Sequence, residues 1–157
     1  MLTQATGNAA SALGYLAAVG GGPELVKAIA EACDIPAPYL AKIVNTLARA
    51  SVVSTQRGIG GGVTLVTDPE ELTIYRLCEV MGDPITQPRC MLGAGECSDE
   101  RACPAHRFAV AQRDKALSFL KDTTIADIAA FEAKRRWGAN GQPPNHDDGV
   151  ETNGAAP

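Results

Sequence analysis

Negative charge is absent from one long stretch of this sequence. Residues 35–67 contain no Asp or Glu, whereas Lys42, Arg49 and Arg57 all lie within them. The whole chain has a net charge of -4, which by itself argues against a nucleic-acid partner. Because carboxylates repel a phosphate backbone, the uneven distribution of charge matters more than its total. The sequence therefore marks residues 35–67 as a candidate surface for DNA.

Features of exported and membrane proteins are also missing. Residues 1–22 contain no Lys or Arg, so the charged region that begins a secretory signal is absent. Charged residues make up 20% of the chain, which is too polar for a membrane span. We expect a cytoplasmic protein without a membrane partner. In that reducing compartment, its five cysteines point to metal binding or redox sensing before they point to disulfides.

Catalytic motifs are scarce as well. The chain has two histidines, and one of them, His146, lies in a segment rich in Gly, Pro and Asn. Because no phosphate-binding loop or nucleophile motif is recognisable, the sequence predicts neither an enzyme nor a small-molecule substrate. The segment 138–157 has almost no large apolar residue, so we expect it to be a disordered tail.

Apolar residues at helical spacing divide the first part of the chain into three helices. The first spans about residues 6–19 and stops at three glycines. The second covers residues 23–33, with Pro23 in its first turn and with Leu25 and Ile29 turned inward. The third carries one apolar face, and the residues on that face are Leu40, Ile43, Val44 and Leu47.

After the third helix the pattern changes to that of short strands. "VVSTQ" and "VTLVT" are β-branched runs on either side of "RGIGGG", which fits two strands joined by a glycine-rich turn. Two short helices followed by a strand, a turn and a strand predict a winged helix-turn-helix in residues 1–82. The fold class is therefore mainly α with a small β-wing. In this arrangement the second helix of the pair enters the major groove of DNA, and the wing contacts the backbone or the minor groove.

A glycine turn with one Arg is common in proteins that do not bind DNA, so the wing alone is weak evidence. The helix pair, the acid-free stretch and the wing together favour DNA binding. Lys42 and Arg49 would supply phosphate or base contacts, and Arg57 is placed to enter a groove. The predicted DNA-binding residues are Pro38, Tyr39, Lys42, Asn45, Arg49, Arg57, Gly58 and Ile59.

The second half of the chain predicts a dimer. A short helix from Thr73 ends at Gly82, and a long helix starts near Pro104. Apolar positions on the long helix outnumber what one packed face of a small domain needs, so a partner helix is implied. A capping-box-like start at Thr124 and Asp127 opens the last helix. We assign residues 107–137 to a dimerisation helix and a C-terminal helix, and expect a two-fold homodimer.

The segment 83–106 carries a set of possible metal ligands. Cys90, Cys97, Cys103 and His106 follow the spacing C-x6-C-x5-C-x2-H. Three thiolates and an imidazole can complete a zinc site or hold an iron-sulfur cluster. Because zinc modules usually place their cysteines closer together, the wide spacing favours a cluster, with zinc and a metal-free thiol switch as alternatives. His106 could equally be a first-turn residue of the long helix.

Several stretches together resemble one family of bacterial regulators. These are "LTQAT", "YLAKIVNTLARASVVSTQRGIGGGVTL", "TIYRLCEVMGDP" and the three-cysteine segment. Over roughly residues 2–137 the chain is similar to the IscR/NsrR-type (Rrf-two) family of iron-sulfur transcription regulators. The resemblance implies a winged-helix homodimer, a repressor in its usual role, that binds a roughly palindromic operator on double-stranded DNA. A cluster near the dimer interface would set the affinity for that operator.

By position, the resemblance assigns the cluster to Cys90, Cys97 and Cys103, with His106 as the fourth ligand of the IscR subgroup. It favours a 2Fe-2S cluster, with 4Fe-4S as a further possibility, and implies sensing of redox state, iron-sulfur status or nitric oxide. The chain departs from the family in three ways. Six residues instead of five separate the first two cysteines, Gly7 stands where nitric-oxide sensors carry an acidic ligand, and Ala41 replaces the glutamate that discriminates between operators in IscR.

Overall fold

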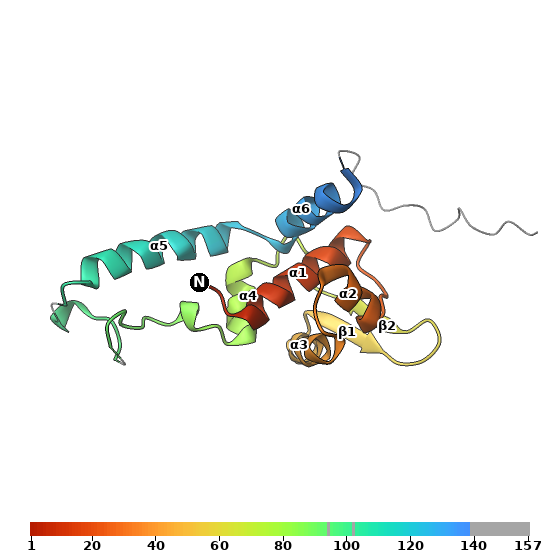
Figure 1. Ribbon diagram of the computed structural model, residues 1–157, viewed down its shortest axis with the longest axis horizontal. Coiled ribbons are helices and arrows are strands. Elements are labelled where there is room, and N and C mark those ends of the chain that lie inside the picture. The colour runs from red at the N-terminus through yellow and green to blue at the C-terminus, as the bar shows by residue number, and fades with distance from the viewer. Residues whose placement is uncertain (94, 102, 139–157) are drawn as a thin grey trace, which may run out of the picture.

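The computed structural model describes residues 1–93, 95–101 and 103–138, and within them the chain is mainly helical (Figure 1). Apart from Gly138, the tail predicted to be disordered lies outside these residues. The elements are α1 (Gln4–Ala18), α2 (Val26–Cys33), α3 (Ala37–Arg49), β1 (Val53–Gln56), β2 (Gly62–Leu65), α4 (Ile74–Met81), η1 (Pro84–Thr86), η2 (Asp99–Arg101), α5 (His106–Asp122) and α6 (Ile125–Trp137). In the part of the chain described, no helix combines the length and apolar character needed to cross a membrane.

The apolar faces of the first four helices form one core. All four residues predicted on the inner face of α3 are buried, which confirms that pattern. The prediction that Leu25 points inward is wrong, because this residue is 62% exposed. Leu25 precedes the first turn of α2 as its N-cap, so it lies outside the helical period that buries Ile29. The largest fully buried apolar side chains are Leu13, Leu16, Ile29, Leu40, Leu47, Leu72, Leu77 and Ile125.

The wing consists of β1 and β2 in antiparallel pairing, which confirms the two predicted strands joined by a glycine-rich turn. In the observed register Val53 lies opposite Leu65. A third segment joins this sheet, because Glu24 and Val63 exchange two backbone hydrogen bonds of 3.0 and 2.7 Å. Gly22 makes this approach possible. Its φ is +104°, and a Cβ there would collide with the carbonyl oxygen of Val63. The glycines after α1 therefore do more than end the helix, since they also bring the chain against β2.

Helix α6 packs on α1, so the last helix that the structure describes belongs to the same core as the winged helix. The predicted capping box is present: Thr124 Oγ1 accepts from the amide of Asp127, and the Asp127 carboxylate accepts from the amide of Thr124. The two helices come so close that a Cβ on Gly14 would collide with the side chain of Ile128. Ile125, at the start of α6, is fully buried.

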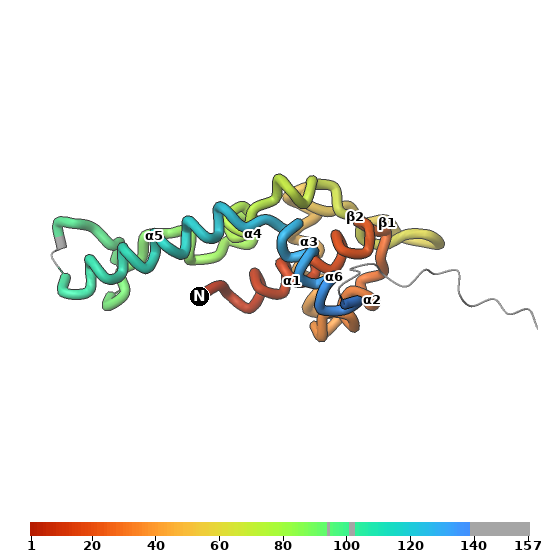
Figure 2. Tube along the Cα trace, turned by 90° about the horizontal axis from the view of Figure 1, so that it is seen from above, coloured from red at the N-terminus to blue at the C-terminus, as the bar shows by residue number. Residues whose placement is uncertain are grey.

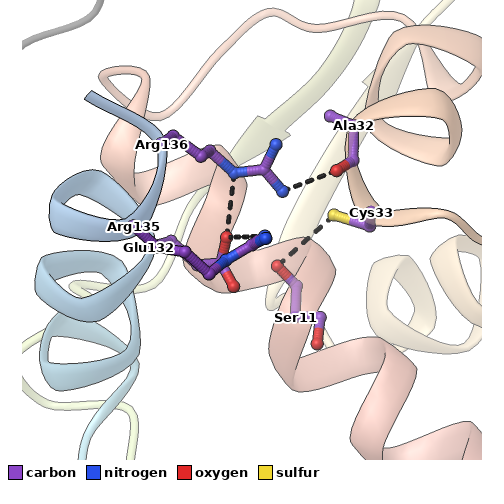
Figure 3. A network of polar contacts seen from close by, with 6 residues as sticks. All are labelled: Ser11, Ala32, Cys33, Glu132, Arg135 and Arg136. Atoms are coloured by element: carbon purple, nitrogen blue, oxygen red, sulfur yellow. Dashed lines mark hydrogen bonds and ion pairs between the residues drawn. The ribbon is translucent and has the colours of Figure 1, made fainter. Parts of the chain in front are cut away.

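Polar contacts lock α6 onto α2 (Figure 3). Glu132 is 7% exposed, and its carboxylate accepts 2.8 Å hydrogen bonds from Arg135 and Arg136. Burial alone raises the pKa of Glu132, but these two arginines outweigh burial and hold that pKa below its usual value. Arg136 also lies over the Tyr15 ring at 4.9 Å and donates to the carbonyl of Ala32 in the last turn of α2. One guanidinium therefore contacts α1, α2 and α6.

Helix α5 and the segment before it project from this core as an arm, defined here as residues 83–122 (Figures 1 and 2). Within α5, Leu120 is the one buried residue. Phe108, Val110 and Phe119 are 55%, 38% and 62% exposed. At its inner end the arm contacts α4 through Lys121, which lies 5.2 Å from the Tyr75 ring centre. Just after the arm, Thr124 pairs with Thr73 in a strand-like bridge.

A buried carboxylate joins the N-terminus to the base of the arm. Asp83 is 1% exposed and follows α4, and its Oδ2 accepts from both the amide and the hydroxyl of Thr3 at 2.8 and 3.0 Å. Burial by itself raises the pKa of Asp83, but hydrogen bonds from Thr6, Thr3 and the Ile85 amide outweigh it and leave that pKa below its usual value.

We predict that Asp83→Ala lowers the free energy of unfolding by about 1–3 kcal/mol at pH 7, because buried donors lose a charged acceptor. Since the folded-state pKa is depressed, this contribution is complete above the pKa of an unfolded Asp, about 3.9, and is lost as the pH falls through the folded-state pKa. Denaturant unfolding followed by circular dichroism should show parent and variant converging in acid. The exposed Glu71→Ala is the control, and a pH-independent difference between Asp83→Ala and the parent would contradict the prediction.

Candidate DNA-binding surface and cysteine site

The outward face of α3 carries the residues predicted to read DNA. Because Leu40, Ile43, Val44 and Leu47 occupy the inner face of the helix, the side chains between them turn toward solvent. Tyr39 is half-buried against the core, so it presents only part of its ring. The predicted residues that are exposed on this helix are Pro38, Lys42, Asn45 and Arg49.

The wing tip presents the remaining predicted residues. Arg57, Gly58 and Ile59 all lie in the exposed turn between β1 and β2, and Ile59 is fully exposed. Gly58 and Gly60 have φ values of +96° and +76°, which glycine adopts without strain. The turn therefore exposes one basic side chain, Arg57, and one large apolar side chain, Ile59.

Helix α3 and the wing line one groove, called here the reading groove, with a volume of about 510 Å³. Asn45 from the helix and Arg57 from the wing both line it, although the two residues belong to separate elements of the sequence. Lys27 and Gln56 also line the groove, and sequence reasoning missed both because neither falls on the predicted helix face or turn. No Asp or Glu is among the lining residues that the structure describes, which suits an anionic ligand.

The cysteine site, defined as Cys90, Cys97, Cys103 and His106, lies at the outer end of the arm. A short backbone pairing holds its first half, in which the Cys90 amide donates to Gly95 and the Cys97 amide donates to Pro88, both at 3.0 Å. A turn holds its second half, since the amide of His106 donates to the carbonyl of Cys103 at 3.0 Å. Residues separated by up to sixteen positions are thereby brought to one place.

The four side chains of the cysteine site line one cavity of about 220 Å³. Cys97 Sγ lies 3.2 Å from Nδ1 of His106, and the other ring nitrogen, Nε2, lies 2.8 Å from Oδ1 of Asp99. Sequence reasoning missed Asp99, and no signal pointed to it, because an Asp two residues after a Cys is typical of any polar loop. The cavity has room for a group several times the size of a water molecule.

The donor arrangement distinguishes between possible occupants. Among the residues that the structure describes, no three His, Cys, Asp or Glu side chains stand close enough together to hold a single ion. A structural zinc site needs four donors around one ion, so it does not fit this arrangement as it stands. Four donors spread around one cavity instead suit a group with more than one metal centre, and thiolates with imidazole are the ligands that iron-sulfur clusters use.

The two other cysteines, Cys33 and Cys78, lie outside this site. Cys78 is fully buried in the core, and burial, with Asp83 nearby, raises the pKa of its thiol to about 11. Cys33 is half-buried at the end of α2 and donates to the carbonyl of Ser11 at 3.7 Å, and burial raises its pKa as well. Both thiols therefore favour the protonated form, which binds metals poorly.

Comparison with known proteins agrees with this architecture. A family model described as Rrf2, iron-dependent transcriptional regulator, matches residues 2–130. A chain of Aquifex aeolicus named as a helix-turn-helix transcriptional regulator is 33% identical over 125 residues, covering 78% of this chain and 87% of that one. The regulator IscR of Escherichia coli is 26% identical over 107 residues, covering 68% and 65% of the two chains.

A solved structure supports the same fold and family. The structure of CymR, the global cysteine regulator of B. subtilis, superposes with a TM-score of 0.68 at 26% identity and covers 83% of this chain and 97% of that one. The predicted winged-helix fold is thereby confirmed, and the relatives are transcriptional regulators, not enzymes. On the match over residues 2–130 and the identity to the Aquifex aeolicus chain, this protein belongs to the Rrf2 family of transcriptional regulators.

Proposed function

We propose that this regulator is a cytoplasmic homodimeric repressor whose affinity for a roughly palindromic operator is controlled by an iron-sulfur cluster. The observation that carries the proposal is the convergence of Cys90, Cys97, Cys103 and His106 on one cavity. The family description as iron-dependent supports an iron-containing ligand. Redox state, iron-sulfur status and nitric oxide are the signals that such a centre can report.

The reading groove and the exposed face of α3 beside it support the DNA-binding part of the proposal. Lys42 and Arg49 on α3 are placed for phosphate or base contacts, while Asn45 has the paired donor and acceptor that recognise adenine in the major groove. Arg57 and Ile59 on the wing reach toward the neighbouring groove or backbone. Because the lining residues include cations and no carboxylate, phosphate neutralisation drives the encounter.

A second copy of the chain is the proposed partner for α5. This helix exposes Phe108, Val110 and Phe119, of which Phe108 and Phe119 lie three turns apart on one face. Exposed aromatic side chains on one face of a projecting helix are stabilised when a second helix covers them. Two-fold pairing along α5 would set two α3 helices at a fixed separation, as a palindromic operator requires.

The arm offers a physical route from the cysteine site to the DNA surface. When bound, an iron-sulfur cluster supplies a centre whose charge and ligand set change on oxidation, nitrosylation or loss. Release of the four donors would free the loop 90–106. Before that loop, the carbonyl of Thr86 accepts from Arg113 of α5 at 3.4 Å. From α5 the chain passes directly into α6, and Arg136 there holds the end of α2. Ligand binding shifts operator affinity only as far as the two states differ in affinity for it.

A thiol switch without a cluster is the alternative, with zinc as a variant of it. The family supports this possibility because CymR, a structural relative, is named as a cysteine regulator. The contact between Cys97 and His106 is also compatible with thiol chemistry. Metal analysis separates the alternatives. Zinc without sulfide would support a zinc-bound thiol switch, and the absence of metal would support a metal-free one.

We predict that anaerobically purified protein is brown and contains iron and sulfide in equal amounts, and that Cys97→Ala loses most of both, because one of four ligands is removed. Elemental analysis and the visible spectrum measure the result. Cys33→Ala is the matched control, because its sulfur lies on α2 and outside the cavity. A colourless parent after anaerobic reconstitution with iron and sulfide would overturn the cluster proposal.

Lys42→Ala and Arg57→Ala should each weaken operator binding and lower the slope of log affinity against log salt by about 1, because each removes one phosphate contact. Fluorescence anisotropy with operator DNA over a salt series provides the measurement. The exposed Lys134→Ala on α6 is the control, because it lies on neither α3 nor the wing. An equal loss in all three variants would show that net charge, and not the surface of α3 and the wing, determines binding.

Phe119→Glu should weaken the dimer about tenfold or more, because a buried Phe contributes about 1.5–3 kcal/mol. Sedimentation velocity over a range of concentrations measures the dissociation constant. Phe131→Glu on α6 is a close control, since Phe131 and Phe119 are both 62% exposed. A parent that sediments as a monomer at every concentration would contradict the proposed dimer. An equal effect of the two substitutions would contradict the placement of α5 in the dimer interface.

A further inference from the structure

Two side chains of the cysteine site, Cys97 and His106, form a continuous chain of polar contacts with Asp99 beside it. His106 stands in the middle, with Nδ1 toward Cys97 Sγ at 3.2 Å and Nε2 toward Asp99 Oδ1 at 2.8 Å. The His106 side chain is 17% exposed, whereas the Asp99 side chain is fully exposed. The imidazole therefore turns one nitrogen to the cavity and the other to a carboxylate at its rim.

The separation of Cys97 and His106 indicates how the two would share a metal. With a metal–sulfur distance of about 2.3 Å and a metal–nitrogen distance of about 2.1 Å, two ligands of one tetrahedral ion lie about 3.6 Å apart. The observed 3.2 Å between Sγ and Nδ1 is close to that value. Ligands of different irons would stand farther apart.

This separation also bears on the number of irons. Four protein ligands divide as two per iron in a 2Fe-2S cluster and as one per iron in a 4Fe-4S cluster. A close pair of ligands is therefore expected in the first case and not in the second. Among the described residues, no third His, Cys, Asp or Glu side chain stands close enough to Cys97 and His106 to share one metal ion with them. The structure therefore brings together a pair of ligands.

Asp99 determines which nitrogen of His106 is available. A metal-bound histidine almost always donates its other ring N–H to a carboxylate, a carbonyl or a water, and this contact fixes the ring orientation. Here the carboxylate accepts from Nε2, which leaves the lone pair of Nδ1 directed into the cavity. Since Asp99 is exposed, solvent weakens this contact, and its effect is expected on ligand orientation and not on folding stability.

We propose that Cys97 Sγ and His106 Nδ1 bind the same iron of a 2Fe-2S cluster, and that Asp99 is a positioning residue that orients the imidazole for it. Cys90 and Cys103 then bind the second iron. The inference rests on the proposed function and goes beyond it by assigning the ligands to the two irons, the coordinating nitrogen and a role for Asp99.

The ligand assignment is tested on the full chain, which is produced in cells supplied with ¹⁵N-histidine and then reconstituted anaerobically with ⁵⁷Fe. Mössbauer spectra should show two inequivalent irons, and pulsed electron paramagnetic resonance of the reduced cluster should show coupling to one imidazole Nδ1. His146→Gln should leave that coupling unchanged, and His106→Cys should abolish it and lower the reduction potential, as expected when thiolate replaces imidazole. A 4Fe-4S cluster, equivalent irons, or coupling to Nε2 would overturn the assignment.

The role of Asp99 is tested by two substitutions of Asp99 and by one control substitution of its neighbour, Glu100. Asp99→Ala should increase the rate of iron loss to a chelator about 10- to 100-fold, as is typical when the partner of a ligating histidine is removed. Asp99→Asn keeps an acceptor oxygen and should restore most of the lost stability, while the exposed neighbour Glu100→Gln should have no effect. Nitrogen-15 spectra of the metal-free full chain provide a second readout, in which His106 carries its proton on Nε2 in the parent and loses that preference in Asp99→Ala.

The outcomes separate this inference from the proposed function. A parent without iron and sulfide overturns both. A parent with a cluster in which Asp99→Ala matches Glu100→Gln in iron loss and in the His106 proton position overturns only the role of Asp99.

Discussion

The close packing of α6 on α1 is the contact on which the rest of this structure depends. Gly14 lets the two helices approach, because any side chain there would occupy the space of Ile128. The Glu132 and Arg136 pair then ties α6 to the end of α2. A buried ion pair of this kind is a weak source of net stability, but breaking it is costly because one charge would remain unpaired. The contact therefore specifies where α6 must lie.

That position gives the arm its geometry. Because α6 is held on the winged helix, α5 begins far from the core and returns to it at Leu120. The cysteine site is thereby placed at the outer end of α5, away from the reading groove, and the exposed apolar residues are distributed along the helix between that end and the core. A ligand at the outer end of the arm can act on DNA binding only through α5 and its attachment to α4 and α6. The separation of ligand site, pairing helix and DNA surface within one short chain suits a regulator.

The elements of the fold could be predicted because their signals are local. Helical periodicity located α3, Thr124 with Asp127 marked the start of α6, and two β-branched runs around a glycine turn marked the wing. The family resemblance, carried by motif residues, is confirmed by the match over residues 2–130. Where local pattern and tertiary packing diverged, as at Leu25, the error came from extending a helical period beyond the first helical turn.

The sequence by itself determined the helices, the wing and the set of thiol and imidazole donors, since each depends on residues within a few positions of one another. Only the tertiary structure decided that Gly22 pairs the chain with β2, that Arg136 reaches Ala32 across 104 positions, and that Asp99 faces His106. These contacts depend on the path of the chain in three dimensions. Many different sequences satisfy the same local periodicity, so spacing along the chain carries no information about which distant side chains will meet.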